Sequence, residues 1–220
     1  MARQLEVYQL IERSLIKKYR KELWNPFIEC VKAYNLVTEN SKITVKLNGD
    51  AKTTLSAKLL QQLQRVSDVP FELYFAENGI SGQVAEKLNI PLSVCPESTA
   101  FVDSVNFDDV VAQALKGIMY ESKIGVTLPK YVENGVTYIN PLYCIKSLHI
   151  NAWLNYNCLD LDNDFSLNSK DVKIFNLLRE LRERDGSIED SIFKSVHSVC
   201  LDTMVGYNYN GSKHFYLDNY

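Results

Sequence analysis

The sequence Ile43-Thr-Val-Lys-Leu-Asn-Gly-Asp-Ala-Lys-Thr-Thr-Leu-Ser-Ala-Lys-Leu-Leu60 predicts a strand, a tight loop and a helix in immediate succession. The strand pattern covers 43–47 and the helix pattern covers 52–65. The loop between them reads Asn-Gly-Asp-Ala-Lys-Thr over residues 48–53. Free backbone N–H groups at the start of a helix attract anions, so such a loop is a common phosphate-binding place. We therefore begin from an α/β unit with a candidate anion site.

The segments after this unit alternate between strand and helix patterns. We expect strands at 71–75 and 91–95, helices at 81–88 and 107–120, and a hairpin around Asn134-Gly135. Strands that alternate with helices are typical of a parallel sheet covered by helices.

Helical patterns dominate both ends of the chain. Apolar residues recur every three or four positions over 5–24, and Pro26 then suits the first turn of a second helix. Near the other end, 169–184 has a helical pattern, and the sequence 187–190 resembles the N-terminal capping signature of one more helix. We expect a trimmed parallel sheet with N-terminal helices and a helical C-terminal tail.

The chain has 220 residues, 46% of them hydrophobic, which is enough for one sizeable core. We divide it into an N-terminal helical segment (1–40), an α/β domain (41–150) and a helical extension (151–220), packed as one compact unit. The net charge of −3 argues against a globally basic nucleic-acid binder, and we expect no DNA partner. The apolar runs are too short to span a bilayer, so we expect no membrane partner. Five scattered cysteines suit a reducing compartment, and we expect a cytoplasmic protein.

Several short segments, taken in order along the chain, follow the plan of one known family. They are Leu10–Ile28, Ile43–Leu47, Asn106–Asp109, Asn140–Tyr143, Ile192–Ser195, Leu201–Thr203 and Leu217–Tyr220. With these segments the chain resembles the TtcA-like PP-loop proteins, which are the bacterial tRNA 2-thiocytidine synthetases and their relatives. The resemblance implies a HUP-type α/β sheet and an ATP-driven exchange of oxygen for sulfur on a tRNA base. It also implies dimers that act on tRNA, and in many members an iron–sulfur cluster held by a CxxC pair and one further cysteine.

The resemblance identifies a degenerate nucleotide loop. The family's loop reads Ser-Gly-Gly-Lys-Asp-Ser, and against it Asn48 replaces the first serine, Gly49 keeps the first glycine and Asp50 replaces the second. Lys52 replaces the aspartate and Thr53 the last serine. A carboxylate beside the pyrophosphate would repel it by about 4 kcal/mol at ~4 Å. Asp50 also suits a helix cap, and we favour the cap over a catalytic or metal-binding role.

The other reactive positions of the family are also changed. Asp109 remains from its Asp-Asp pair, but residues 104–106 replace its Gly-His-His, Asn140 replaces an arginine, and no CxxC is present. The resemblance therefore implies no iron–sulfur cluster and no other cofactor here. Binding of ATP with magnesium is the alternative.

We hypothesise a catalytically silent PP-loop protein that acts as a partner, scaffold or regulatory subunit, paired with itself or with an active paralogue. A first alternative is a retained ATP-dependent tRNA-modifying enzyme that uses Gly49, Lys52, Thr53 and Asp109 in altered roles. A second is an RNA-binding module whose contacts come from the basic face of the first helix; otherwise this face is simply solvated. The basic residues are Arg13, Lys17, Lys18, Arg20 and Lys21.

One acidic stretch partly matches the calcium-loop template. Asp160, Asp162, Asp164 and Asp171 occupy its first, third, fifth and twelfth positions. Phe165, however, stands at the sixth position, where the sharp turn requires glycine. We favour a solvated acidic loop that caps the next helix over a cation site.

Overall fold

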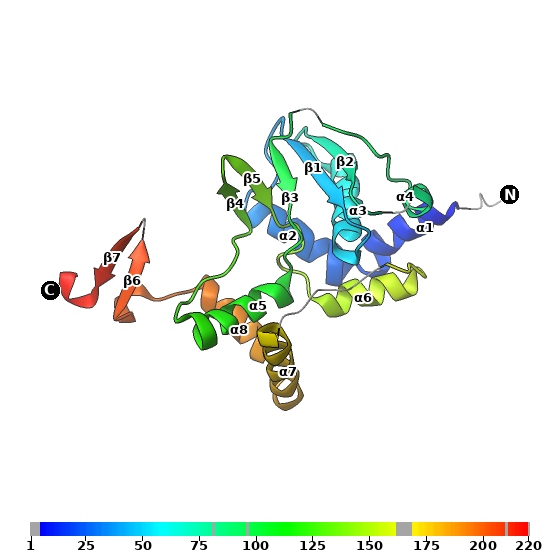
Figure 1. Ribbon diagram of the computed structural model, residues 1–220. Coiled ribbons are helices and arrows are strands. Elements are labelled where there is room, and N and C mark those ends of the chain that lie inside the picture. Colours follow the sequence, from blue (N-terminus) through cyan, green and yellow to red (C-terminus); the bar gives the residue numbers. More distant parts are fainter. Residues whose placement is uncertain (1–4, 81, 96, 162–168, 210, 220) are drawn as a thin grey trace.

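A five-stranded sheet forms the centre of the protein in the computed structural model (Figure 1). Its order is β2-β1-β3-β5-β4, with β4 antiparallel to β5 and the other pairings parallel. The strands are β1 (Lys42–Leu47), β2 (Glu72–Glu77), β3 (Ala100–Val102), β4 (Lys130–Glu133) and β5 (Val136–Ile139). The structure describes residues 5–80, 82–95, 97–161, 169–209 and 211–219. This arrangement confirms the predicted α/β class with a mainly parallel sheet.

Three of the four central helices were predicted, and they follow the predicted order. They are α3 (Ala51–Val66), α4 (Gly82–Lys87), α5 (Phe107–Lys116) and α6 (Ser147–Tyr156), and a π-helical turn (Gly117–Glu121) extends α5. Helix α3 packs against β1 and β2, and its apolar side chains from Ala51 to Leu63 are buried. Helix α6 was not predicted, because the spacing of its apolar residues Leu148, Ile150 and Trp153 does not place them on one face of a helix.

The N-terminal helix is less regular than the sequence predicts. Helix α1 (Val7–Arg13) continues into two π-helical turns (Ser14–Lys18 and Arg20–Trp24) before α2 (Asn25–Ala33). Apolar residues recur every four positions from Ile11 to Phe27, and in a regular α-helix each such step drifts by about 40° around the axis. The wider π turns remove this drift, so the apolar stripe keeps facing the core.

The predicted strand at 91–95 is wrong. This segment runs beside β2, where Ser93 N–H donates to Phe75 O (2.8 Å) and Phe75 N–H donates to the Ser93 hydroxyl (3.2 Å). The serine side chain thus takes the place of a backbone acceptor, and no ladder forms. The third parallel strand is the short β3 instead.

The C-terminal part contains α7 (Ser169–Arg184) and α8 (Ile188–His197), close to the predicted limits. It then forms a hairpin that was not predicted, made of β6 (Gly206–Tyr209) and β7 (Ser212–Phe215). Short 3-10 turns at Leu201–Thr203 and Tyr216–Asn219 flank this hairpin, so the predicted helical tail is interrupted by two strands. Among the described residues, no helix combines the length and the apolar character that a transmembrane span requires.

A buried ionic cluster joins α1, α3 and the end of α4. The Lys58 side chain is fully buried, and its ammonium donates to Glu12 Oε1 (2.8 Å), Gln61 Oε1 (2.9 Å) and Leu88 O (2.8 Å). Arg65 Nη1 binds the other Glu12 oxygen at 2.6 Å. Burial lowers the pKa of Lys58, although the bond to Glu12 opposes the shift. Burial would raise the pKa of Glu12, but the hydrogen bonds from Arg65 and Lys58 outweigh it and lower that pKa.

Candidate functional site

The predicted loop lies at the point where the order of the strands in the sheet reverses. From β1 the chain passes through α3 to β2 on one side, whereas β3 lies on the other side of β1. Loops that leave the carboxyl ends of two such strands diverge and form the usual ligand crevice of an open α/β sheet. Residues 48–53 follow β1, and Asp109 lies in the first turn of α5, which follows β3. The structure thus brings the predicted loop and Asp109 together.

Asp50 caps α3, as predicted. Its Oδ1 accepts a hydrogen bond from Thr53 N–H (2.8 Å), and its Oδ2 accepts one from the Thr53 hydroxyl (2.8 Å). These are donors that a helix N-terminus offers to a bound phosphate. A carboxylate of the chain itself therefore occupies the anion position at the start of α3.

Lys52 and Asp109 neutralise each other. Lys52 Nζ lies 2.5 Å from Asp109 Oδ2, and the lysine side chain is only 9% exposed. The same carboxylate oxygen accepts a hydrogen bond from Asn106 N–H (2.9 Å), while Asn106 Oδ1 accepts one from Asp109 N–H (3.3 Å). Asn106 and Asp109 form a capping box for α5, whose sequence signal is an asparagine three residues before an acidic residue. This capping role of Asn106 was not predicted.

Gly49 is required by a close approach of two loops. Its φ is +82°, and a Cβ at this position would lie 3.0 Å from the carbonyl oxygen of Gly79, in the loop after β2. Next to it, Asn78 Nδ2 donates to Asn48 Oδ1 at 2.6 Å. The retained glycine therefore has a structural reason that does not involve a phosphate.

A hollow of about 240 Å³ opens beside the loop, on the β2 side. It is lined by Asn48, Gly49, Gly79, Ile80, Val84, Asp160 and Leu161. Its volume is below the roughly 300–1,000 Å³ of common ligand pockets, so it suits only a small group.

The two acidic-loop candidates that the structure describes, Asp160 and Asp171, have different surroundings. Asp160 lines this hollow, whereas the Asp171 carboxylate binds Lys116 Nζ at 2.7 Å. Asp162 and Asp164 lie outside the described residues. Within the part of the chain that the structure describes, no group of three or more His, Cys, Asp or Glu side chains is placed to hold a metal ion.

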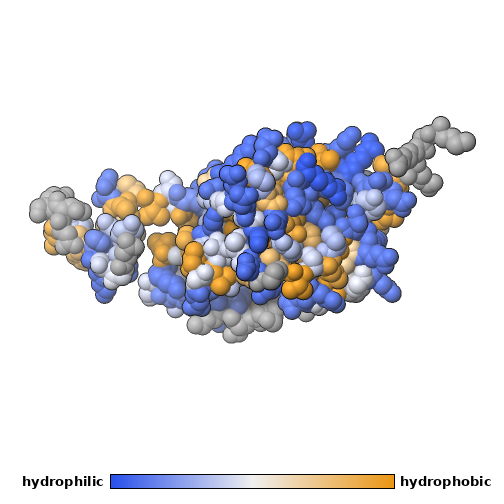
Figure 2. All heavy atoms as spheres, turned by 90° about the horizontal axis from the view of Figure 1, so that it is seen from above, coloured by the Kyte–Doolittle hydropathy of each residue, from blue (hydrophilic) through white to orange (hydrophobic). Residues whose placement is uncertain are grey.

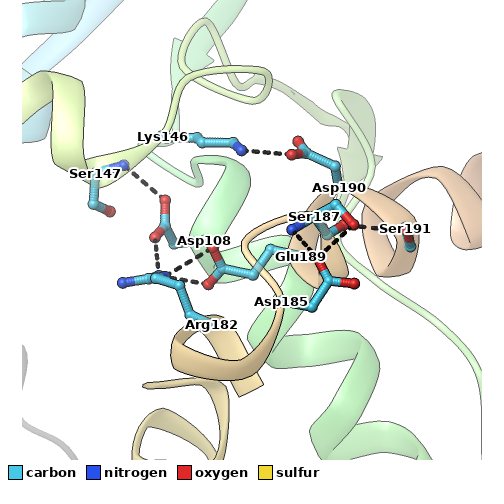
Figure 3. Close-up of polar contacts among 9 residues, drawn as sticks. All are labelled: Asp108, Lys146, Ser147, Arg182, Asp185, Ser187, Glu189, Asp190 and Ser191. Atoms are coloured by element: carbon cyan, nitrogen blue, oxygen red, sulfur yellow. Dashed lines mark hydrogen bonds and ion pairs between the residues drawn. The ribbon is translucent and has the colours of Figure 1, made fainter. Parts of the chain in front are cut away.

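Asp108, the neighbour of Asp109, is also bound within the chain (Figure 3). Its Oδ2 accepts a hydrogen bond from Ser147 N–H (2.7 Å), and its Oδ1 lies 3.6 Å from Arg182 Nη2. Arg182 in turn makes a two-pronged pair with Glu189, through Nε (3.0 Å) and Nη2 (2.5 Å). Both carboxylates of the Asp-Asp pair therefore serve internal contacts.

Ion pairs and a small apolar cluster fasten α7 and α8 to the rest of the protein. The ion pairs are Arg182–Asp108, Lys116–Asp171 and Lys146–Asp190. The apolar cluster, separate from the main core, contains Phe107, Val111, Ile174 and Leu178. The C-terminal helices thus rest on α5, the helix that begins at the candidate site.

Asn140, which stands where the resemblance expects an arginine, is a buried clamp. Its Oδ1 accepts a hydrogen bond from Val105 N–H (3.1 Å), and its Nδ2 donates to Leu128 O (2.9 Å). It therefore holds the loop after β3 to the segment before β4.

Two cysteines that are remote in the sequence meet in space. Cys30 Sγ lies 3.8 Å from Asn140 O and close to the Cys144 thiol. Cys144 and burial raise the pKa of Cys30, whereas Cys30 lowers the pKa of Cys144. No local sequence signal predicts such a pair, because it depends on how α2 packs against the turn after β5.

The predicted basic face is exposed. Arg13, Lys17, Lys18, Arg20 and Lys21 all reach solvent from α1 and the π-helical turns. None of them forms a salt bridge with another described residue. The Lys18 ammonium lies 3.5 Å from the centre of the Tyr156 ring, in cation–π geometry.

No protein-family model and no curated protein sequence matches the chain. Among solved structures, the U34-tRNA thiolase NcsA from Methanococcus maripaludis, determined with its [4Fe-4S] cluster, has a similar fold. The TM-score is 0.60 at 14% sequence identity, and the match covers 79% of this chain and 76% of that chain. The chain therefore has a tRNA-thiolase-like fold, in agreement with the predicted PP-loop-like sheet.

Proposed function

We propose that this chain is a catalytically silent protein of the PP-loop type, which acts as a partner or scaffold, with itself or with an active paralogue, in tRNA modification. The observation that carries the proposal is the Asp50 carboxylate bound to the backbone N–H and hydroxyl of Thr53. The tRNA-thiolase-like fold supports the connection to tRNA modification.

The contacts around Asp50 oppose a triphosphate in the same place. A phosphate at the start of α3 would have to displace Asp50 from Thr53 and would lie beside its negative charge. Lys52, the nearest cation in the loop, is already paired with Asp109. Buried and paired groups of this kind are costly to separate, because each partner would be left without its hydrogen bonds.

This proposal predicts that the purified protein does not activate ATP. In an ATP–pyrophosphate exchange assay with bulk tRNA and magnesium, we expect exchange at the background level, and in calorimetry no heat of ATP binding. Asp50→Gly frees the donors of Thr53 and changes helix capping by only a few tenths of a kcal/mol, so we expect ATP affinity to rise at least about tenfold. Asp68→Gly, just beyond the other end of α3, is the matched control.

Robust exchange by the unaltered protein, abolished by Lys52→Ala, would instead establish the retained enzyme. ATP binding that is equally weak in Asp50→Gly and the unaltered protein would show that Asp50 is not what closes the loop.

A second candidate function is RNA binding by the basic face. The observation in its favour is that its exposed cations form no salt bridge with described residues and lie next to an aromatic ring. We predict a gel shift with bulk tRNA that weakens steeply with salt, and that Lys17→Glu with Lys21→Glu weakens binding by about tenfold or more. Lys173→Glu, an exposed position on α7, should leave the shift unchanged. No shift at low salt would remove this function.

A further inference from the structure

The C-terminal hairpin forms an arm that projects from the body (Figures 1 and 2). Its strands β6 and β7 pair only with each other among the described strands. A two-stranded hairpin is at best marginally stable in water, so an arm of this kind needs a further surface to pack against.

The arm carries the apolar side chains for such packing. Val205 is 66% exposed, Tyr209 65% and Phe215 51%. In Figure 2, apolar residues lie where the arm leaves the body and near its far end, and Tyr207 stacks on His214 with ring centres 4.9 Å apart. Contiguous exposed apolar surface usually marks a contact site.

The body offers one open sheet edge that fits the arm. The outer edge of β2 is accompanied by the segment around Ser93, whereas no described strand pairs with the outer edge of β4. Val132 on β4 is 69% exposed. Strands β4, β6 and β7 each have 4 residues, so their lengths match. An unpaired edge strand is a template for a strand of another chain.

The charges of arm and edge are complementary. Lys213 on β7 and Glu133 at the end of β4 are both exposed, and neither forms an ion pair with any residue in the described ranges. The other charge on this edge, Lys130, already donates to Asn35 O at 2.7 Å.

We propose that the arm of one copy of this chain adds to the outer edge of β4 in a second copy, with Lys213 facing Glu133. Each copy has one arm and one open edge, so a two-fold axis closes the exchange into a dimer. The inference specifies the surface of the self-pairing contained in the proposed function. Sedimentation does not respond to ATP chemistry, so the two proposals can fail separately.

The first test is sedimentation velocity of the full chain over roughly 1–100 μM, a range that spans micromolar dissociation constants. We expect a monomer–dimer equilibrium, and a dissociation constant at least about tenfold higher for Phe215→Asp. Glu86→Lys, an exposed position on α4, should behave like the unaltered protein. A monomer at every concentration, or a dimer that Phe215→Asp leaves unchanged, overturns the proposal.

The second test exchanges the charges. Glu133→Lys or Lys213→Glu alone should weaken the dimer about three- to tenfold, since each places like charges opposite each other. The double variant should recover to within about threefold of the unaltered protein, because the pair is restored in reverse. No response to either single change, or no recovery in the double variant, overturns the pairing of this arm with the β4 edge.

Discussion

Lys58→Met is expected to lower the free energy of unfolding by about 3–5 kcal/mol. The ammonium of Lys58 is fully buried, and its removal leaves the Gln61 side-chain oxygen and the Leu88 carbonyl without this donor, while Glu12 Oε1 keeps only the longer bond from Arg65 Nη2 (3.2 Å). Arg65 still binds Glu12, which favours the lower end of this range. Urea unfolding followed by circular dichroism measures the change, and the melting temperature should fall by roughly 6–20 °C.

The control for this prediction removes both charges of the pair. Glu12→Gln combined with Lys58→Met should recover much of the lost stability, because no buried charge then lacks its partner. Lys173→Met, at an exposed position on α7, should change stability by less than about 0.5 kcal/mol. A similarly small effect of Lys58→Met would contradict the importance of the buried cluster.

Gly49→Ala is expected to destabilise the protein by about 2–3 kcal/mol. The residue has φ +82°, which disfavours any side chain, and the new Cβ would lie 3.0 Å from a backbone oxygen of Gly79. That oxygen belongs to the loop after β2, and it can move only if the two loops separate. Urea unfolding again provides the measurement.

Gly135→Ala is a matched control for the alanine substitution. Gly135 lies in the β4–β5 turn with almost the same φ, +79°, but a Cβ there meets nothing within 4 Å. It should cost only about 1 kcal/mol, and the difference between the two variants isolates the close approach of the loops. Equal losses would show that backbone conformation alone explains Gly49.

The elements with strong local signals were predictable from the sequence. The strand and helix around the loop have consistent periodicity, and Asn134-Gly135 adopts the positive φ values that its hairpin turn requires (50° and 79°). Strand β3 was missed because three residues carry little periodicity. The β6–β7 hairpin was missed because its strands bury no face and therefore show no alternation.

The same distinction applies to the candidate site. The cap by Asp50 was predictable, because donor and acceptor are three residues apart. The pairing of Lys52 with Asp109 and the approach of Gly49 to Gly79 were not, because they join segments that the fold brings together from different loops. A single sequence indicates which groups need partners, but not which distant groups supply them.

The internal carboxylate at the start of α3 has a consequence for how the protein depends on its surroundings. A protein with an open phosphate-binding loop is stabilised by nucleotide that binds there, so its stability rises when nucleotide is abundant and falls when nucleotide is scarce. Here the first turn of α3 carries its own counter-charge, since Asp50 is covalently part of the chain. The N–H and hydroxyl of Thr53 therefore keep the same acceptor whether nucleotide is scarce or abundant.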